Sequence, residues 1–463
     1  MSYCLEAMTS CFQGLIPATL YTCSRDGIPN VAYLSHVDYV DASHVALSFQ
    51  FFNKSRRNIE ENPQALVKLI DPDTRQGWRF RLRYVRSETS GPVFERMALR
   101  IEAIASYCGL KGIFKLLAAD IYEVLSVEKS AEETGLPEGS SWLGGERRPS
   151  LDPVFTMKAM QDLSERIHGA DSLEGLLDSI LVGLEASFGF NHSMILLAGE
   201  KPGELVTIAS RGYPDAGVGA EVRFGEGIIG MVAEARKPIR ISGLLREMLY
   251  AYAVHKRAQE EGVTTRYERI PLPGLAKPES QLGIPLLVRG DLVGVLCIES
   301  ESPYRFHEED RASIELLGSY LAIAIQNMIL QERSESVADT TPPPQAAARV
   351  PTRAATPKRD VVFYRGDECI LIDGEYLIRS LPANILWKLL SLRTSQGRCE
   401  FTNRELRLDK SLNLPEWKDN LESRLLLLRR RLEQKCPEIR ITPRARGRFA
   451  LEVGCEVSLS EKP

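Results

Sequence analysis

Two stretches of the chain contain too few large apolar residues to build a core, and they divide its 463 residues into three modules. Residues 131–153 are rich in Gly, Pro, Ser and Glu, and residues 333–359 hold Pro342-Pro343-Pro344 within a run of Ala, Thr, Arg and Pro. Segments of this composition behave as linkers. We therefore expect a multidomain protein with modules at residues 1–130, 154–332 and 360–457, in keeping with the usual size of ~100–200 residues per domain.

The overall composition is that of an ordinary globular protein, with 44% hydrophobic and 26% charged residues. The net charge of -4 provides no field that would draw the whole chain to nucleic acid or to an acidic membrane. No stretch approaches the roughly 18–20 uncharged apolar residues of a membrane-spanning helix, and the first residues lack the features of a signal peptide. These observations predict a cytoplasmic protein without membrane contact.

Nine cysteines are scattered along the chain without a single CxxC pair. Zinc sites usually show closely spaced ligand pairs, and disulfide frameworks belong to short secreted chains. We predict reduced thiols and no metal site. A metal centre assembled from distant cysteines is the less favoured alternative.

The first module alternates short apolar runs with turn signals such as Arg25-Asp26-Gly27, a spacing typical of antiparallel strands in a small β-barrel. From Trp78 to Tyr84 apolar and arginine residues alternate strictly, as in a strand with one buried face. After the run HVALSFQF, the basic segment NKSRRN (residues 53–58) begins a short helix. Its Lys and Arg charges, Ser hydroxyl and N–H groups at a helix start suit a phosphate dianion.

In this order of elements the module resembles the pyridoxamine 5'-phosphate oxidase-like FMN-binding split barrel, up to about residue 125. The resemblance implies FMN as the cofactor, with its phosphate held by Lys54, Ser55 and Arg57 and its ring beside Ser48 and Gln50. It singles out no catalytic residue, and the family has other members that use haem or deazaflavin. The alternative interpretation is a solvated helix start that binds no ligand.

The middle module begins and ends with helical patterns that enclose strands, which indicates an α+β domain. Two of its segments, FGEGIIGMVAEARKP (residues 224–238) and GIPLLVRGDLVGVLCIESESPYRFHEED (residues 283–310), resemble a GAF domain. The resemblance implies a small-molecule pocket, for which the insert at residues 244–280, with His255, would supply a lid. The sequence shows no recognisable cyclic-nucleotide signature, so the ligand is unknown.

Helical patterns at Met157–Ile167 and Ile314–Gln331 carry apolar residues at helical spacing. In domains related to GAF such helices pair between subunits, so one expectation is a homodimer that passes signals along this bundle. An equal alternative is that both stripes pack against the domain's own sheet.

Residues 416–448 carry ten Lys or Arg against five Asp or Glu, a local basic surface that suits phosphates. A helix, a short polar helix, a long helix at residues 416–433 and a strand-turn-strand follow in an order that resembles the winged helix-turn-helix of OmpR-type response regulators. In that family the long helix enters the major groove and the wing the neighbouring minor groove. The resemblance implies DNA contacts by Lys418, Asn420, Arg424, Arg429, Arg430, Arg444, Arg446 and Arg448.

Two departures from that pattern keep a second interpretation open. The wing reads Arg-Gly-Arg-Phe where the family favours Gly-x-Gly-Tyr, and no receiver domain precedes the module. The arginines could instead bind an acidic protein partner or pair with acids on a solvated face. The leading hypothesis is a ligand- or redox-responsive transcriptional regulator that binds DNA. Its rivals are an FMN-dependent oxidoreductase regulated by its GAF domain, and a signalling scaffold that uses the winged helix for protein interaction.

Overall fold

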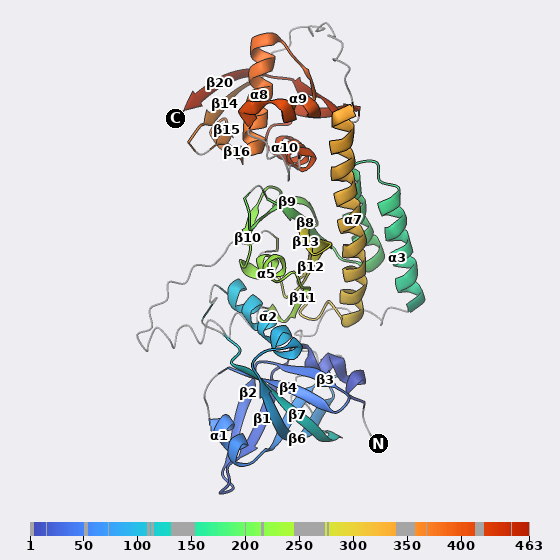
Figure 1. Ribbon diagram of the computed structural model, residues 1–463, viewed down its shortest axis with the longest axis vertical. Coiled ribbons are helices and arrows are strands. Elements are labelled where there is room, and N and C mark those ends of the chain that lie inside the picture. The colour runs from blue at the N-terminus through green and yellow to red at the C-terminus, as the bar shows by residue number, and fades with distance from the viewer. Residues whose placement is uncertain are drawn as a thin grey trace.

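Three folded modules follow one another along the long axis of this computed structural model (Figure 1). The structure describes residues 4–14, 16–50, 54–72, 74–108, 112, 115–130, 153–199, 201–213, 217–244, 274–275, 277–338, 357–366, 368–412, 421–445 and 447–462. A β-rich N-terminal module and an α+β middle module are therefore confirmed as parts of a multidomain chain.

The N-terminal module is a seven-stranded antiparallel sheet in the order β2-β1-β5-β6-β7-β4-β3. The edge strands β2 and β3 are separated by only Ser35 and His36, so the sheet must curl until its edges approach each other. The expected alternation is confirmed in β6, where Trp78, Phe80 and Leu82 are buried between exposed arginines. The elements are η1 (Leu5–Gln13), β1 (Ala18–Cys23), β2 (Pro29–Leu34), β3 (Val37–Asp41), β4 (His44–Phe49), α1 (Lys54–Glu61), β5 (Gln64–Ile70), β6 (Gly77–Glu88), α2 (Pro92–Tyr107) and β7 (Ala118–Lys129).

Helix α2 is absent from the sequence-based expectations, and it belongs to two cores at once. It begins at a proline, which tolerates the first helical turn. Met97, Ile101 and Ala105 pack with Ala119 and Ile121 of β7, whereas Ala103 joins the core of the middle module. The N-terminal and middle modules are therefore joined by a shared helix.

The middle module is a six-stranded antiparallel sheet in the order β10-β9-β8-β13-β12-β11. Because strand side chains alternate between faces, Ile195 and Leu197 of β8 pack towards α3, α4 and α7, and Met194 and Leu196 pack towards α5. Its elements are α3 (Pro153–His168), α4 (Leu173–Phe188), β8 (His192–Ala198), β9 (Glu204–Arg211), β10 (Glu221–Arg223), α5 (Gly227–Ala235), β11 (Ile239–Ser242), β12 (Ser280–Val288), β13 (Asp291–Ser300) and α7 (Glu308–Ala338).

Helix α7 runs along the middle module and ends beside the C-terminal module (Figure 1). Its segment Glu308–Gln331 is long and apolar enough, by length and composition, to cross a membrane, which corrects the expectation that the chain has no such stretch. Ile314, Leu317 and Leu321 are buried in the core of the middle module, so part of this hydropathy serves packing. One such helix is weak evidence for a membrane span.

The C-terminal module combines a four-stranded sheet, β16-β15-β14-β20, with a three-stranded sheet, β17-β19-β18. Strand β20 pairs in parallel with β14 and extends the module beyond the expected boundary at residue 457. Its elements are β14 (Lys358–Tyr364), β15 (Cys369–Ile372), β16 (Glu375–Arg379), α8 (Leu381–Gln396), β17 (Glu400–Thr402), α9 (Asn403–Leu408), η3 (Lys410–Leu412), α10 (Leu421–Lys435), β18 (Ile439–Ala445), β19 (Arg448–Val453) and β20 (Glu456–Lys462).

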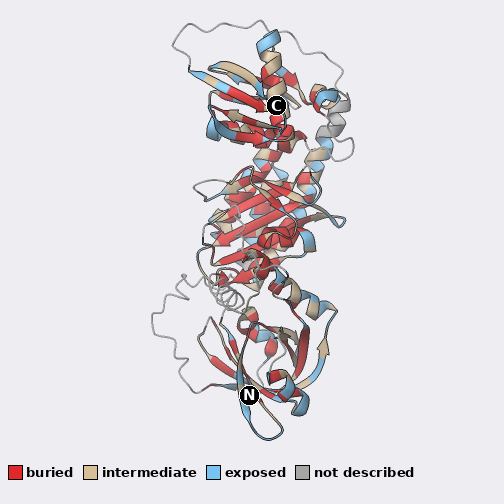
Figure 2. Ribbon diagram, turned by 90° about the vertical axis from the view of Figure 1, so that its left-hand side faces the viewer, coloured by how far each residue is buried: buried red, intermediate tan, exposed pale blue. Residues whose placement is uncertain are grey.

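Buried residues continue from the middle module into the C-terminal module, as the red bands in Figure 2 show. One hydrophobic cluster includes Leu176 of α4, Ile208 of β9 and Leu427 of α10. Gly219 lies so close to Leu427 and Arg431 that a side chain there would contact both. The two modules therefore pack against each other instead of being loosely tethered.

Candidate functional sites

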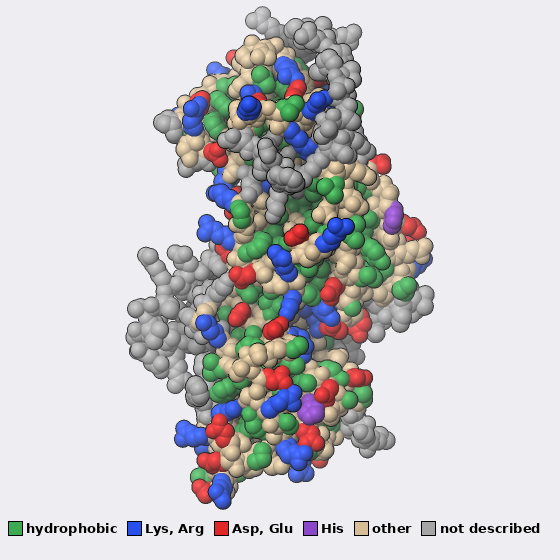
Figure 3. All heavy atoms as spheres, in the orientation of Figure 1, with side chains coloured by type: hydrophobic (Ala, Val, Ile, Leu, Met, Phe, Trp, Pro, Cys, Tyr) green, Lys and Arg blue, Asp and Glu red, His purple; other side chains and the backbone are tan. Residues whose placement is uncertain are grey.

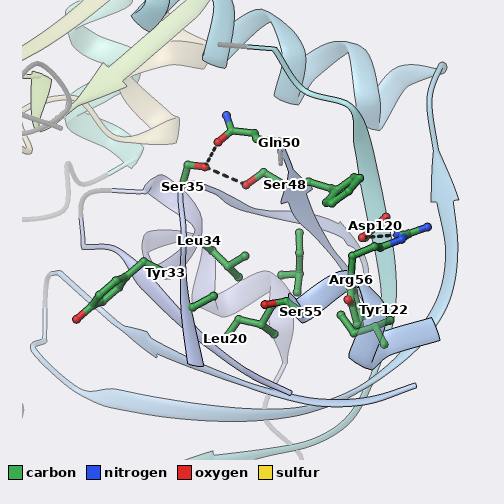
Figure 4. Close-up of a pocket in the computed structure, with 14 residues that line it drawn as sticks. Leu20, Tyr33, Leu34, Ser35, Ser48, Gln50, Ser55, Arg56, Asp120 and Tyr122 are labelled. Atoms are coloured by element: carbon green, nitrogen blue, oxygen red, sulfur yellow. Dashed lines mark hydrogen bonds and ion pairs between the residues drawn. The ribbon is translucent and has the colours of Figure 1, made fainter. Parts of the chain in front are cut away.

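A cavity opens in the N-terminal module between β2, β4, β7 and α1 (Figure 4). Its empty volume is ≈ 570 Å³, a figure that includes the open solvent at its mouth. Much of its wall is aliphatic or aromatic. The cavity is lined by Leu20, Ala32, Tyr33, Leu34, Ser35, Leu47, Ser48, Phe49, Gln50, Ser55, Arg56, Ile59, Asp120 and Tyr122.

One side of this cavity is a cluster of uncharged polar groups. Ser35 Oγ donates to Gln50 Oε1 at 2.6 Å and lies 3.3 Å from Ser48 Oγ. The backbone fixes this cluster, because the His36 N–H donates to Ser48 Oγ and the Ser48 N–H donates to the His36 carbonyl, both at 3.1 Å. These groups can donate and accept hydrogen bonds without carrying charge.

The opposite side is an ion pair between Arg56 and Asp120 (Figure 4). Arg56 Nη1 donates to both Asp120 carboxylate oxygens at 2.8 Å and to Ser87 Oγ at 2.9 Å. Burial alone would lower the pKa of Arg56, but its hydrogen bonds to Asp120 raise it, so the guanidinium remains charged. The Arg56 guanidinium also lies 5.1 Å from the centre of the Phe49 ring.

The structure brings three of the five expected cofactor residues to this cavity. Ser48, Gln50 and Ser55 line it, whereas Lys54 and Arg57 are exposed and do not. A helix turns by about 100° per residue, so α1 cannot point neighbouring residues all one way. Buried Ile59 fixes the inward face, which Ser55 shares four residues earlier. A helical wheel anchored on Ile59 would have turned Lys54 and Arg57 outward.

A second buried polar cluster lies at the end of β13. The Glu299 side chain, in a residue only 3% exposed, accepts hydrogen bonds from Gln281 Nε2 and, at 2.7 Å, from the Leu275 N–H. Burial raises the pKa of Glu299 to about 7, although these hydrogen bonds act in the opposite direction. Leu275 falls within the insert that the sequence predicts to be a ligand lid, but most of that insert, with His255, lies outside the described residues.

Native stability should fall as the pH rises through the pKa of Glu299. The unfolded chain releases this proton near pH 4.5 and the folded chain near 7, so the contribution of Glu299 to native stability is greatest below pH 4.5. Glu299→Gln cannot ionise, so between about pH 4.5 and about pH 8 the wild type should lose about 3 kcal/mol relative to the variant. Urea denaturation of both proteins over this range measures the difference, and parallel stability curves would contradict it.

The arginine-rich helix α10 faces the middle module. Arg429 Nη1 lies 2.7 Å from Glu174 Oε2, and Arg430 Nη2 lies 2.6 Å from Asp178 Oδ1, both acids being on α4. Arg430 Nη1 also donates to the Ile208 carbonyl of β9 at 3.1 Å. Only 12% of each arginine side chain is exposed.

Arg424 does not face outward as the sequence analysis expects, because the residue is 6% exposed. It lies three residues after Leu421 and four before Leu428, which puts it on the stripe that α10 turns into its own module. Arg444 is exposed and pairs with Glu452 at 2.7 Å, and Arg448 in β19 is half-buried. Lys418, Asn420 and Arg446 lie outside the described residues.

Helix α2 holds the middle module by hydrogen bonds as well as by packing. Ser106 Oγ donates to the Gly225 carbonyl at 2.7 Å and accepts from the Gly227 N–H at 2.9 Å, at the start of α5. Arg100 bridges the modules by donating to the Gln13 carbonyl at 2.8 Å and to the Arg240 carbonyl at 3.2 Å. The turn at residues 224–227 is therefore fixed by the neighbouring module.

The nine cysteines are all free thiols in this structure. Within the part of the chain that the structure describes, no three His, Cys, Asp or Glu side chains lie together as a metal site would require.

Comparison with known proteins identifies the middle module. The family model of the GAF domain matches residues 170–326. A comparison with curated proteins finds no match. Among solved structures, the GAF domain of a phosphoenolpyruvate-protein phosphotransferase from Coxiella burnetii is 24% identical, with a TM-score of 0.32 over 40% of this chain and 98% of that one.

Two other solved structures each resemble a part of the chain. An FMN-binding protein from Syntrophomonas wolfei is 16% identical, with a TM-score of 0.23 over 28% of this chain and 88% of its own. Free methionine-R-sulfoxide reductase from Neisseria meningitidis is 16% identical, with a TM-score of 0.30 over 38% of this chain and 91% of its own. The sequence motifs and the matching family model agree for the middle of the chain: residues 170–326 are a GAF domain.

Proposed function

We propose that this chain is a cytoplasmic, ligand-responsive transcriptional regulator whose GAF domain restrains a DNA-binding C-terminal module. A GAF domain is a sensory module, which supports ligand-responsive signalling. In the proposal the ligand of the GAF domain is a small molecule of unknown identity, and the N-terminal cavity supplies a second input.

The contact between α10 and the GAF domain carries this proposal. In each ion pair across this contact, the arginine belongs to the C-terminal module and the acid to the GAF domain. Arg379 of β16 adds a third pair with Glu221 of β10. The GAF carboxylates thus occupy the cations that DNA phosphates would otherwise engage.

The arrangement of the C-terminal module supports DNA as the target. Helices α8, α9 and α10 are followed by the β18–β19 hairpin, the order expected for a winged helix-turn-helix. Lys and Arg side chains are spread over this module at the top of Figure 3, where Asp and Glu side chains are also present. DNA and the GAF domain would compete for one face of α10.

DNA titration of the full chain tests the proposal. Duplex DNA of random sequence should bind weakly and with a steep salt dependence, measured by fluorescence anisotropy. Arg429→Ala with Arg430→Ala should reduce the slope of log K against log salt by about 2, because two phosphate contacts are lost. The control pair Arg79→Ala with Arg81→Ala, exposed on β6, should leave the slope unchanged. No DNA binding at low salt, or equal slopes for both variants, would refute the function.

We further propose that the regulator is a homodimer joined through α7. Beyond the face buried in the GAF core, α7 exposes a second stripe whose members are four and three residues apart in turn. This is the spacing of a two-stranded coiled coil, in which a single polar residue sets the register. The stripe consists of Leu316, Tyr320, Ile323, Asn327 and Leu330. A second copy of this chain is the partner that matches such a stripe.

The alternative of an FMN-dependent oxidoreductase depends on whether the N-terminal cavity fits FMN. Two of the cations expected to hold its phosphate, Lys54 and Arg57, lie outside the cavity. The cation inside, Arg56, is paired with Asp120. These residues do not suit a phosphate dianion, and we derive no reaction through FMN.

A further inference from the structure

The charge of the N-terminal cavity limits the ligand that it can take. Asp120 has a side chain only 7% exposed, and both of its oxygens accept from Arg56 Nη1. Arg56 Nε is directed to a second carboxylate, that of Glu60, at 3.0 Å. Among the described residues that line the cavity, Arg56 is the single cation, and two carboxylates share it.

A phosphate dianion near Arg56 would stand beside the Asp120 carboxylate. Two like charges about 4 Å apart repel strongly in a partly buried site, and that repulsion would oppose the attraction of Arg56. Ser87 Oγ, beside the ion pair, also donates to Asp120. The polar groups on this side of the cavity are satisfied by each other.

The rest of the lining suits an uncharged, flat molecule. Leu34, Leu47 and Ile59 give aliphatic walls, and Phe49 supplies an aromatic one. Across from the ion pair, Ser35, Ser48 and Gln50 form the uncharged hydrogen-bonding cluster (Figure 4). Heterocycles with ring nitrogens and carbonyl groups match such a combination, since they stack on aromatic faces and exchange neutral hydrogen bonds.

From this geometry we propose that the cavity binds an uncharged heteroaromatic ligand that carries no phosphate, held by Ser35, Ser48 and Gln50 and selected against phosphate by Asp120. The inference deepens the proposed function, on which it rests, by giving the chemical class of the second input.

Riboflavin and FMN test the inference, because they share one ring system and side chain and differ by the phosphate. Titrated separately into the full chain and followed by flavin fluorescence, riboflavin should bind about tenfold more tightly than FMN, a difference of about 1.4 kcal/mol. Asp120→Asn keeps the shape of the side chain and removes its charge. It should leave riboflavin affinity within about threefold and improve FMN affinity about tenfold.

Two further variants separate the parts of the argument. Lys54→Ala with Arg57→Ala removes exposed cations outside the cavity and should change neither affinity. Ser48→Ala with Gln50→Ala should weaken both ligands about equally, because it removes neutral hydrogen bonds to the shared ring.

Three outcomes of these titrations would overturn the inference. If FMN binds the wild type more tightly than riboflavin, or if neither binds below millimolar concentration, the ligand class is wrong whatever the variants do. If Asp120→Asn folds, judged by circular dichroism, and leaves the ratio of the two affinities unchanged, Asp120 is not the selecting group. None of these titrations involves DNA, so failure of the regulatory function is recognised separately in the DNA assay.

Discussion

Reversing the two acids of α4, by Glu174→Arg with Asp178→Arg, should release α10 from the GAF domain and raise the affinity of the full chain for DNA about tenfold or more. In the wild type these acids hold Arg429 and Arg430. Because Asp178 is more than half exposed and Glu174 one third, each pair contributes only about 1 kcal/mol. Reversal adds repulsion between arginines, so about 2–3 kcal/mol of restraint should be lost.

Added positive charge alone would favour DNA, so the control must match it. Asp171→Arg with Glu185→Arg makes the same change in net charge at an exposed acid just before α4 and at a half-buried acid in its last turn. Glu185 pairs with Arg211 of β9, and neither acid forms an ion pair with α10. This control should gain far less affinity for DNA than the variant Glu174→Arg with Asp178→Arg. Limited proteolysis should cut near α10 in that variant and not in the control. Equal gains in both proteins would show that α4 does not restrain α10.

If the proposed homodimer forms through α7, a single charge on the exposed stripe of that helix should convert it to monomers. Ile323 lies in the middle of the stripe and is 49% exposed in the single chain, so Ile323→Glu should not disturb the GAF core. In a dimer it would lose the burial of two isoleucines, at ~1.5–3 kcal/mol each, and bring two carboxylates together. The dimer dissociation constant should rise more than a hundredfold, as measured by analytical ultracentrifugation.

Ser319→Glu is the matched control for the dimer. Ser319 is exposed on the same helix but lies beside the stripe, where a coiled coil tolerates charge. The control should therefore remain dimeric at concentrations where Ile323→Glu is monomeric. If the wild type sediments as a monomer, the proposal that α7 pairs with a second copy of this chain is wrong.

Local periodicity was sufficient to predict the strand at Trp78–Tyr84, but it could not decide which way α10 faces. The alternation at Trp78–Tyr84 requires only that one side of a strand be buried, and the structure confirms it. The prediction that Arg424 faces outward is wrong, and the sequence of α10 shows why. In the run LLLLRRR, at residues 425–431, leucines occur on every side of the helix, so the pattern does not mark an exposed face.

The contacts between modules depend on residues that are far apart in the sequence. Nothing near Ser106 indicates that its hydroxyl will hold the turn at Gly225, 119 residues away. Asp120 likewise pairs with Arg56, 64 residues away. The sequence therefore suggested a phosphate site, because it did not show that a carboxylate would balance the charge of Arg56. Such pairings arise from the order of strands in a sheet and from module packing, neither of which a local pattern contains.

The helix α2 has a consequence for how the GAF domain can be isolated and how it moves. Residues 170–326 match the family model, but α2 covers α5 and β11 on one side of that domain and α10 covers α4 and β9 on another. A fragment cut at the ends of the match would expose two apolar surfaces that the intact chain buries. The same helix forms a wall of the N-terminal core, so a shift of α2 on one side must repack the other. The three modules therefore share parts of their hydrophobic cores and do not behave as separate domains joined by linkers.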